Sequence, residues 1–206
     1  MVRYEALVTR LRAGETVMID GGTGTECERR GIPQLENAWN GGGAISHPDI
    51  VRAIHQDYLE HGAELIISNT FATSLHALQA ADKGNQFDEY NRAAVELAIE
   101  ARNASNRPNA LVAGGISYWS WTGHHPPLSE IEASIAQQAV VMRDAGADLL
   151  MLEMMIDIDR MLTTLAAAQT SGLPVWVGIS CVQNSDAVMT PVSYTHLTLP
   201  TKDGGW

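Results

Sequence analysis

The stretch Val17–Gly31 reads VMIDGGTGTECERRG, and it sets the interpretation of the whole chain. An apolar segment ends in Asp20, and Gly21, Gly22 and Thr23 follow in a loop with few side chains. A carboxylate beside accessible backbone N–H groups suits a zwitterion, because the acid binds an ammonium group and the amides bind a carboxylate. This pattern favours a site for an α-amino acid, although a tight turn that needs positive φ angles explains the glycines equally well on their own.

The loop lacks the two phosphate-binding patterns that most often follow a strand. The spacing G-x-G-x-x-G of dinucleotide sites is not met, and the loop has no lysine of the kind that a P-loop requires. The glycines therefore do not indicate a nucleotide site.

Five short apolar segments are predicted to be buried parallel strands, because they are almost continuously apolar rather than alternating. They are Thr16–Asp20, Glu64–Asn69, Ala110–Ser117, Asp148–Glu153 and Pro174–Ser180. Helical periodicity predicts helices between them, and three of these helices end in a glycine just before the next strand. Alternating strands and helices leave two α/β architectures, a doubly wound open sheet and a (β/α)₈ barrel.

Both architectures place ligands at the carboxyl ends of the strands, so the residues at those ends are the candidate site. Asp20, Asn69 and Glu153 end three of the predicted strands, and Cys181 follows the last one. Glu153 is interpreted as a second acid for the same ammonium group, with a structural ion pair as the alternative. Cys181 is either a small buried side chain, a thiolate nucleophile or a zinc ligand.

Three other groups of residues have structural interpretations that are weighed before any functional one. Cys27 lies on the expected helix after the loop and is interpreted as structural. His124 and His125 are adjacent in a proline-rich loop, where polarity alone explains them. Tyr118 and Trp121 belong to an aromatic loop, with Trp119 between them, that either walls a pocket or packs internally.

Composition excludes several classes of partner. The chain has 206 residues, of which 45% are hydrophobic and 18% charged, and its formal net charge is -11, so it is globular and unsuited to nucleic acid. No apolar run approaches the length of a membrane span, and no signal peptide is apparent at the N-terminus. Two cysteines are too few for a disulfide scaffold, which favours a reducing, cytoplasmic location.

Five separated motifs resemble the homocysteine S-methyltransferase family in order and spacing, from about Asp20 to about Asp186. They are DGGTGTECERRG, HPDIVRAIHQDYLEHGAELIISNTF, LVAGGIS, GADLLMLEMMID and PVWVGISC. The resemblance, not the periodicity, selects the (β/α)₈ barrel over the open sheet. It implies homocysteine as methyl acceptor, zinc held by three cysteine thiolates, and S-methylmethionine, S-adenosylmethionine or betaine as donor.

The resemblance also implies a role for each strand-end residue. Asp20 and Glu153 hold the amino group of homocysteine, and Cys181 is the first zinc ligand. Zinc deprotonates the bound thiol, which then attacks the donor methyl group in line. The remaining contacts to homocysteine are expected from Gly21, Gly22, Thr23 and Asn69.

The chain departs from the family pattern towards its C-terminus. About five of the eight strand–helix units are visible, and the adjacent cysteine pair that supplies the other zinc ligands is absent. We therefore expect a partial barrel domain over residues 1–191 and a non-native tail over 192–206. Five strands leave two open edges, so this truncated chain is predicted to be inactive and poorly soluble.

Two alternatives remain open. The first is a non-catalytic chain, either a metal-free amino-acid-binding protein or a partial barrel that a partner chain completes. A different barrel lyase or aldolase is weaker, because neither Lys83 nor Lys202 ends a predicted core strand.

Overall fold

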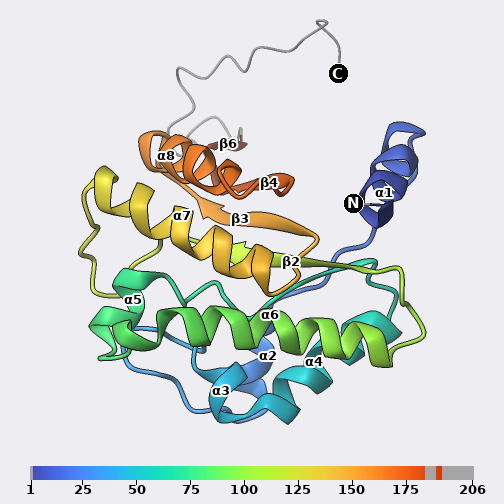
Figure 1. Cartoon of the computed structure of the whole chain (residues 1–206), viewed down its shortest axis with the longest axis horizontal. Coiled ribbons are helices and arrows are strands. Elements are labelled where there is room, and N and C mark those ends of the chain that lie inside the picture. Colours follow the sequence, from blue (N-terminus) through green and yellow to red (C-terminus); the bar gives the residue numbers. More distant parts are fainter. Residues whose placement is uncertain (1, 184–188, 192–206) are drawn as a thin grey trace, which may run out of the picture.

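The structure is a computed structural model that describes residues 2–183 and 189–191, with side chains described up to Ser180. Helices and strands alternate through most of the chain (Figure 1). The helices are α1 (Val2–Arg12), α2 (Thr23–Arg29), α3 (Gly43–Ser46), α4 (Pro48–Glu60), α5 (Leu75–Ala80), the 3₁₀ turn η1 (Gly84–Gln86), α6 (Phe87–Ala104), α7 (Leu128–Asp144) and α8 (Ile158–Gln169). The strands are β1 (Leu65–Ile67), β2 (Leu111–Ile116), β3 (Leu149–Met155), β4 (Val175–Ile179), β5 (Cys181–Gln183) and β6 (Met189–Pro191).

The central sheet is parallel, and its strands lie in the order β1-β2-β3-β4, which is also their order in the sequence. Leu65 is the register partner of Leu111 across β1 and β2, and Ala113 is that of Leu149 across β2 and β3. A doubly wound sheet reverses its strand order at a switch point, whereas a barrel does not. The described strands therefore follow the winding of a barrel, as expected.

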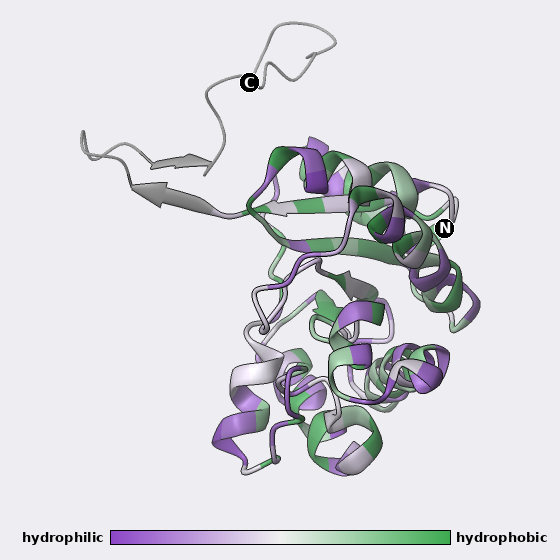
Figure 2. Ribbon diagram, turned by 90° about the vertical axis from the view of Figure 1, so that its left-hand side faces the viewer, coloured by the Kyte–Doolittle hydropathy of each residue, from purple (hydrophilic) through white to green (hydrophobic). Residues whose placement is uncertain are grey.

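The connecting helices cover one face of this sheet with a continuous apolar layer. Ile66 and Val112 of the strands pack with α4 and α6, and Leu150 and Leu152 of β3 pack with α7 and α8. These four strand residues are fully buried, and removing such apolar surface from water is the dominant favourable term in folding. Figure 2 shows the strands coloured mainly as hydrophobic, while the helices carry both hydrophobic and hydrophilic residues.

Helix α1 covers the opposite, inner face of the sheet, and the sequence did not predict it. Leu7 is buried in one cluster with Leu65, Leu111 and Leu149, among other inner-face residues of the strands. The indole Nε1 of Trp176 on β4 donates a hydrogen bond of 3.1 Å to the hydroxyl of Tyr4 on α1. An amphipathic N-terminal helix thus protects apolar side chains that would otherwise face solvent at this end of the sheet.

The predicted first strand, Thr16–Asp20, is wrong as a full strand. It forms a single parallel bridge between Ile19 and Leu65, flanked by hydrogen bonds from Asp20 N–H to the Leu65 carbonyl and from Glu64 N–H to the Met18 carbonyl. Among the described residues β1 is its only neighbour, so Met18 stays 56% exposed and Ile19 46% exposed. Four parallel strands, rather than five, make the described sheet.

The carboxyl end of β4 leads into a feature that the sequence did not predict. β5 and β6 pair antiparallel as a separate two-stranded unit. The predicted boundary at 191 stays a prediction, because the tail over 192–206 lies outside the described residues. Within the described part of the chain, no helix combines the length and apolarity needed to cross a membrane.

Candidate substrate site at the carboxyl edge of the sheet

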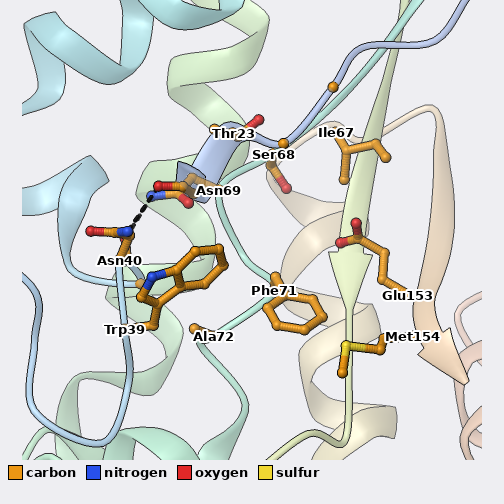
Figure 3. Close-up of a pocket in the computed structure, with 14 residues that line it drawn as sticks. Thr23, Trp39, Asn40, Ile67, Ser68, Asn69, Phe71, Ala72, Glu153 and Met154 are labelled. Carbon is orange, nitrogen blue, oxygen red and sulfur yellow. Dashed lines mark hydrogen bonds between the residues drawn. The ribbon is translucent and has the colours of Figure 1, made fainter. Parts of the chain in front are cut away.

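A pocket of about 270 Å³ opens at the carboxyl edge of the sheet, where loops that follow three separate elements meet (Figure 3). One wall is the loop after the Ile19 bridge, one is the segment before α3, and one is the carboxyl ends of β1 and β3. Its lining residues are Gly21, Gly22, Thr23, Gly24, Trp39, Asn40, Gly41, Ile67, Ser68, Asn69, Phe71, Ala72, Glu153 and Met154.

The structure brings most of the predicted site residues together in this pocket. Gly21, Gly22, Thr23, Asn69 and Glu153 all line it, although they come from segments up to 130 residues apart in the sequence. The winding of the sheet accounts for this, because parallel strands in sequential order deliver all their carboxyl ends to one edge.

Asp20 directly precedes Gly21 of the pocket lining, is not itself among the lining residues, and is partly shielded from solvent. Its Oδ2 accepts a hydrogen bond of 2.7 Å from the backbone N–H of Ile67, while its buried Oδ1 has no partner among the described residues. Burial raises the pKa of Asp20 to about 7, and the hydrogen bond from Ile67 opposes that rise. A buried acid with an unpaired oxygen favours a cationic partner, since an isolated carboxylate is costly away from water.

Glu153 presents the second acid of the pocket. Burial raises its pKa to about 8, and repulsion from the nearby Asp20 carboxylate adds to the rise. Burial raises the pKa of both acids, and the Asp20 carboxylate further raises that of Glu153, so a positive charge beside them favours ionisation of both near neutral pH. The pair is thus arranged to receive a cation.

Glu153 reaches the pocket through an irregularity in β3. The register runs from Leu152 opposite Val177 to Met155 opposite Ile179, so β3 uses one residue more than β4 over this interval. Met154, inside the interval, has a φ of 59°, which side chains other than glycine rarely adopt. Bulges of this kind often re-aim side chains beside functional sites.

A glycine on the neighbouring strand makes room for the acid. A Cβ atom built on Gly115 would overlap Oε2 of Glu153 and lie 2.9 Å from Cγ2 of Ile67. Gly115 therefore leaves room for the Glu153 carboxylate, whereas Gly114 allows close packing against Met142 and Leu150.

Residues 17–196 match the sequence model that describes homocysteine S-methyltransferases. The chain belongs to the homocysteine S-methyltransferase family.

Curated relatives of this family resemble the chain over most of its length. It is 30% identical over 175 residues to betaine–homocysteine S-methyltransferase 1 of Rattus norvegicus, covering 82% of this chain and 42% of that protein. It is 29% identical over 171 residues to the S-methylmethionine–homocysteine S-methyltransferase of Pongo abelii, covering 83% of this chain and 45% of that protein. The chain therefore spans less than half the length of these two relatives.

Solved structures agree on the fold. The metallated form of the homocysteine methyltransferase MmuM from Escherichia coli superposes with a TM-score of 0.72 at 24% identity, covering 86% of this chain and 66% of that one. The oxidised form gives a TM-score of 0.67 at 25% identity, covering 79% and 61%. The α/β arrangement with a parallel sheet is thus that of known members of the family.

A zinc site is not formed by the part of the chain that the structure describes. Those residues contain no group of three or more His, Cys, Asp or Glu side chains placed to hold a metal ion. Cys27 is fully buried among apolar side chains of α4 and α6, in agreement with its structural interpretation. Cys181 begins β5 directly after the carboxyl end of β4, but its side chain lies outside the described side chains. His124 and His125 are exposed.

Sequence reasoning missed two asparagine contacts that shape the pocket. The side chain of Asn69 donates a hydrogen bond of 2.8 Å to the backbone carbonyl of Asn40, and Nδ2 of Asn40 donates one of 2.8 Å to the carbonyl of Gly24 (Figure 3). This chain of bonds ties the glycine-rich loop to the end of β1. Asn40 is 1% exposed and its Oδ1 has no partner among the described residues, so a buried acceptor remains beside the pocket.

Most of the aromatic wall of the pocket was also not predicted from the sequence. Trp39 and Phe71 line the pocket, and their rings meet edge to face with centroids 6.2 Å apart. Trp121 joins them, with ring centroids 6.2 Å from Trp39 and 5.9 Å from Phe71. The sequence left open whether residues 118, 119 and 121 wall a pocket or pack internally. Trp121 lies against the aromatic wall, whereas Tyr118 is buried. A face of aromatic rings is suited to a cation as well as to apolar groups.

Proposed function

We propose that this pocket binds the amino-acid end of homocysteine and that the protein transfers a methyl group from a cationic donor to the homocysteine thiol, giving methionine. The observation that carries the proposal is the pair of acids, Asp20 and Glu153, at the carboxyl edge of the sheet: Oδ1 of Asp20 is buried without a partner among the described residues, and burial raises the pKa of both, so a cation beside them favours their ionised forms. Membership of the family supplies the identity of the acceptor.

The amino group of homocysteine satisfies both acids. An ammonium group offers three N–H donors, so it can reach the unpaired Oδ1 of Asp20 and a carboxylate oxygen of Glu153 at the same time. Its charge lowers both pKa values, and the two acids then become ionised near neutral pH. Binding is therefore linked to release of protons from the empty pocket.

The carboxylate of homocysteine is proposed to bind the backbone of the glycine-rich loop. The N–H groups of Gly22 and Thr23 have no acceptor among the described residues, and Gly22 caps α2 without a side-chain hydrogen bond. Asn69, fixed by its bond to the carbonyl of Asn40, lines the pocket beside the loop and completes the proposed contacts. Neutral amides are the preferred partners of a carboxylate where no arginine or lysine lines the site.

The donor is proposed to place its positive charge against the aromatic wall of Trp39, Phe71 and Trp121. S-methylmethionine, S-adenosylmethionine and betaine all carry a methyl group on a sulfonium or ammonium centre, which aromatic faces attract. In the reaction the thiol releases its proton to solvent, its sulfur forms a bond to the methyl carbon, and the bond from that carbon to the donor's positive atom breaks. The electron pair of the broken bond leaves with the now neutral donor.

Zinc is proposed as a cofactor only through Cys181, and the described residues do not complete its site. Metal analysis tests the point: zinc near one per chain in the wild type that is lost in Cys181→Ser and kept in Cys27→Ser supports the proposal. Zinc near zero in the wild type contradicts it for this chain.

Calorimetric titration followed by a methyl-transfer assay tests the function. Homocysteine is expected to bind, and both Asp20→Asn and Glu153→Gln are expected to weaken it. The assay then adds each of the three donors and measures methionine. Failure of homocysteine to bind contradicts the proposal.

The same assay separates the remaining alternatives. Binding without methionine formation supports the predicted inactivity of this chain and fits the amino-acid-binding or partner-completed alternatives, whereas turnover refutes the predicted inactivity. A cytoplasmic location also remains a proposal, based on the two cysteines alone.

A further inference from the structure

The bulge in β3 has an unusual consequence for the pocket. In a regular strand, successive side chains point to opposite faces of the sheet. Glu153 and Met154 are successive, yet both line the same pocket (Figure 3). The positive φ of Met154 makes this possible, and such a conformation costs free energy that the surroundings must offset.

The residues that follow the bulge are fixed by one side chain from another loop. The hydroxyl of Tyr118, just after β2, accepts hydrogen bonds of 2.7 Å from the backbone N–H of Ile156 and 2.6 Å from that of Asp157. Tyr118 is 3% exposed, and its ring packs in the same core cluster as Met155. Both the ring and the hydroxyl are therefore held in place.

The segment is also anchored on its far side. Asp157 is the N-cap of α8, and its Oδ1 accepts a hydrogen bond of 2.9 Å from the backbone N–H of Arg160. The backbone N–H of Ser180 donates a hydrogen bond of 3.0 Å to the carbonyl of Met155. The chain from Met155 to α8 thus has little freedom, and Tyr118 is its contact with the loop that carries Trp121.

We propose that Tyr118 is a positioning residue whose hydroxyl holds the chain after the β3 bulge and thereby directs the Glu153 carboxyl into the pocket. The consequence for homocysteine binding rests on the proposed function, whereas the consequence for the Glu153 carboxyl does not. Without the hydroxyl, the two hydrogen bonds that it accepts from this segment are lost, and the strained conformation of Met154 relaxes. The acid then swings away from Asp20 and towards solvent.

The first measurement follows the ionisation of Glu153 itself. ¹³C NMR of carboxyl-labelled glutamate gives its titration, and Glu153→Gln identifies the resonance. In the wild type the Glu153 carboxyl is expected to titrate at about pH 8. Tyr118→Phe, which keeps the ring, is expected to move the titration towards the ordinary value of about 4.3 by at least about one unit. Tyr90→Phe, which removes the hydroxyl of a buried tyrosine on α6, is the matched control and is expected to leave it unchanged.

A rescue variant keeps the test decisive if Tyr118→Phe folds poorly. Met154→Gly removes the cost of the positive φ, because glycine adopts that region freely. The double variant of Met154→Gly and Tyr118→Phe is therefore expected to titrate nearer to the wild type than Tyr118→Phe alone. If Glu153 titrates identically with and without the Tyr118 hydroxyl, the proposal is overturned.

The second measurement uses two ligands that differ only in the amino group, L-homocysteine and 4-mercaptobutanoic acid. Tyr118→Phe is expected to weaken homocysteine about tenfold and to leave the analogue unchanged. It is expected to cost no further affinity in the Glu153→Gln background, because both changes remove one contact. Equal weakening of both ligands would indicate a purely structural role and overturn the proposal. A wild type that binds no homocysteine, with the Glu153 titration still moved by Tyr118→Phe, overturns the proposed function and leaves the positioning role standing.

Discussion

Replacing Glu153 by glutamine is expected to remove a loss of stability that the wild type undergoes as the pH rises from about 5 to about 7, while weakening ligand binding. Burial and the neighbouring Asp20 raise the pKa of Glu153 from 4.5 to about 8. As the pH rises, the unfolded chain therefore releases this proton before the folded chain does. Over that interval the folded state binds more protons, so the free energy of unfolding decreases with increasing pH.

The size of the effect follows from the width of the interval. One pKa unit corresponds to about 1.36 kcal/mol, and between about pH 5 and about pH 7 the side chain stays largely protonated in the folded chain and ionised in the unfolded one. Glu153 therefore costs about 2.5 kcal/mol of stability over this range. Glutamine does not ionise, so Glu153→Gln lacks this loss.

Urea unfolding at the two pH values measures the difference. The wild type is expected to lose about 2.5 kcal/mol more than Glu153→Gln between them, with equal m-values. Glu132→Gln, an exposed residue of α7, controls for the loss of one negative charge. Identical pH dependence of wild type and Glu153→Gln would refute the argument that this acid is buried and destabilised by Asp20.

Three further substitutions test packing around the site and in the core. Gly115→Ala is expected to lower the free energy of unfolding by about 1–3 kcal/mol in urea, because the new methyl group overlaps the Glu153 carboxylate; an unchanged midpoint would contradict the close approach. Gly24→Ala places a methyl group against the indole ring of Trp39 in the aromatic wall. Titrations followed by tryptophan fluorescence are expected to show several-fold weaker binding of the methyl donor. Equal affinity of variant and wild type would show that the wall is not the donor site. Arg102→Met removes the buried cation that lies 3.0 Å from the carboxylate of Asp148 and leaves it, among the described residues, only the more exposed Arg3, at 3.7 Å, and the N–H of Val112. Thermal or urea unfolding is expected to show a loss of about 1.5–3 kcal/mol, and a loss below about 1 kcal/mol would mean that this ion pair contributes little.

Much of the sheet was predictable because β2 and most of β3 are short runs of apolar residues buried on both faces, and β1 and β4 are similar apolar runs, although β4 is only partly buried. The same rule failed for Thr16–Asp20, since an apolar run becomes a full strand only where neighbours exist on its flanks. Helix caps were more reliable: Gly62, Gly146 and Gly172 all adopt positive φ, with values of 111°, 99° and 77°. The residues at a helix end determine how that helix is capped, whereas the pairing of a strand depends on residues far away in the sequence.

The acids of the pocket were predictable from position, and the aromatic wall was not. Asp20 and Glu153 are each an acid at the end of an apolar segment, and this pattern can be read directly from the sequence. Trp39 and Phe71 lie in irregular segments, where no periodicity reports which way a ring points. The positive φ of Met154 could not be predicted either, because methionine, unlike glycine, does not indicate a positive φ in a sequence.

The contact between α1 and β4 sets an order of events during synthesis. Tyr4 and Trp176, whose rings lie 6.5 Å apart, are separated by 172 residues. The helix leaves the ribosome first, yet its hydrogen-bond partner emerges only after three strands and their crossover helices. Until then the apolar side of α1, including Leu7, has no complete surface to pack on. The contact between α1 and β4 therefore forms late in folding. Until β4 has been synthesised, the apolar side of α1 is available for contacts with other molecules.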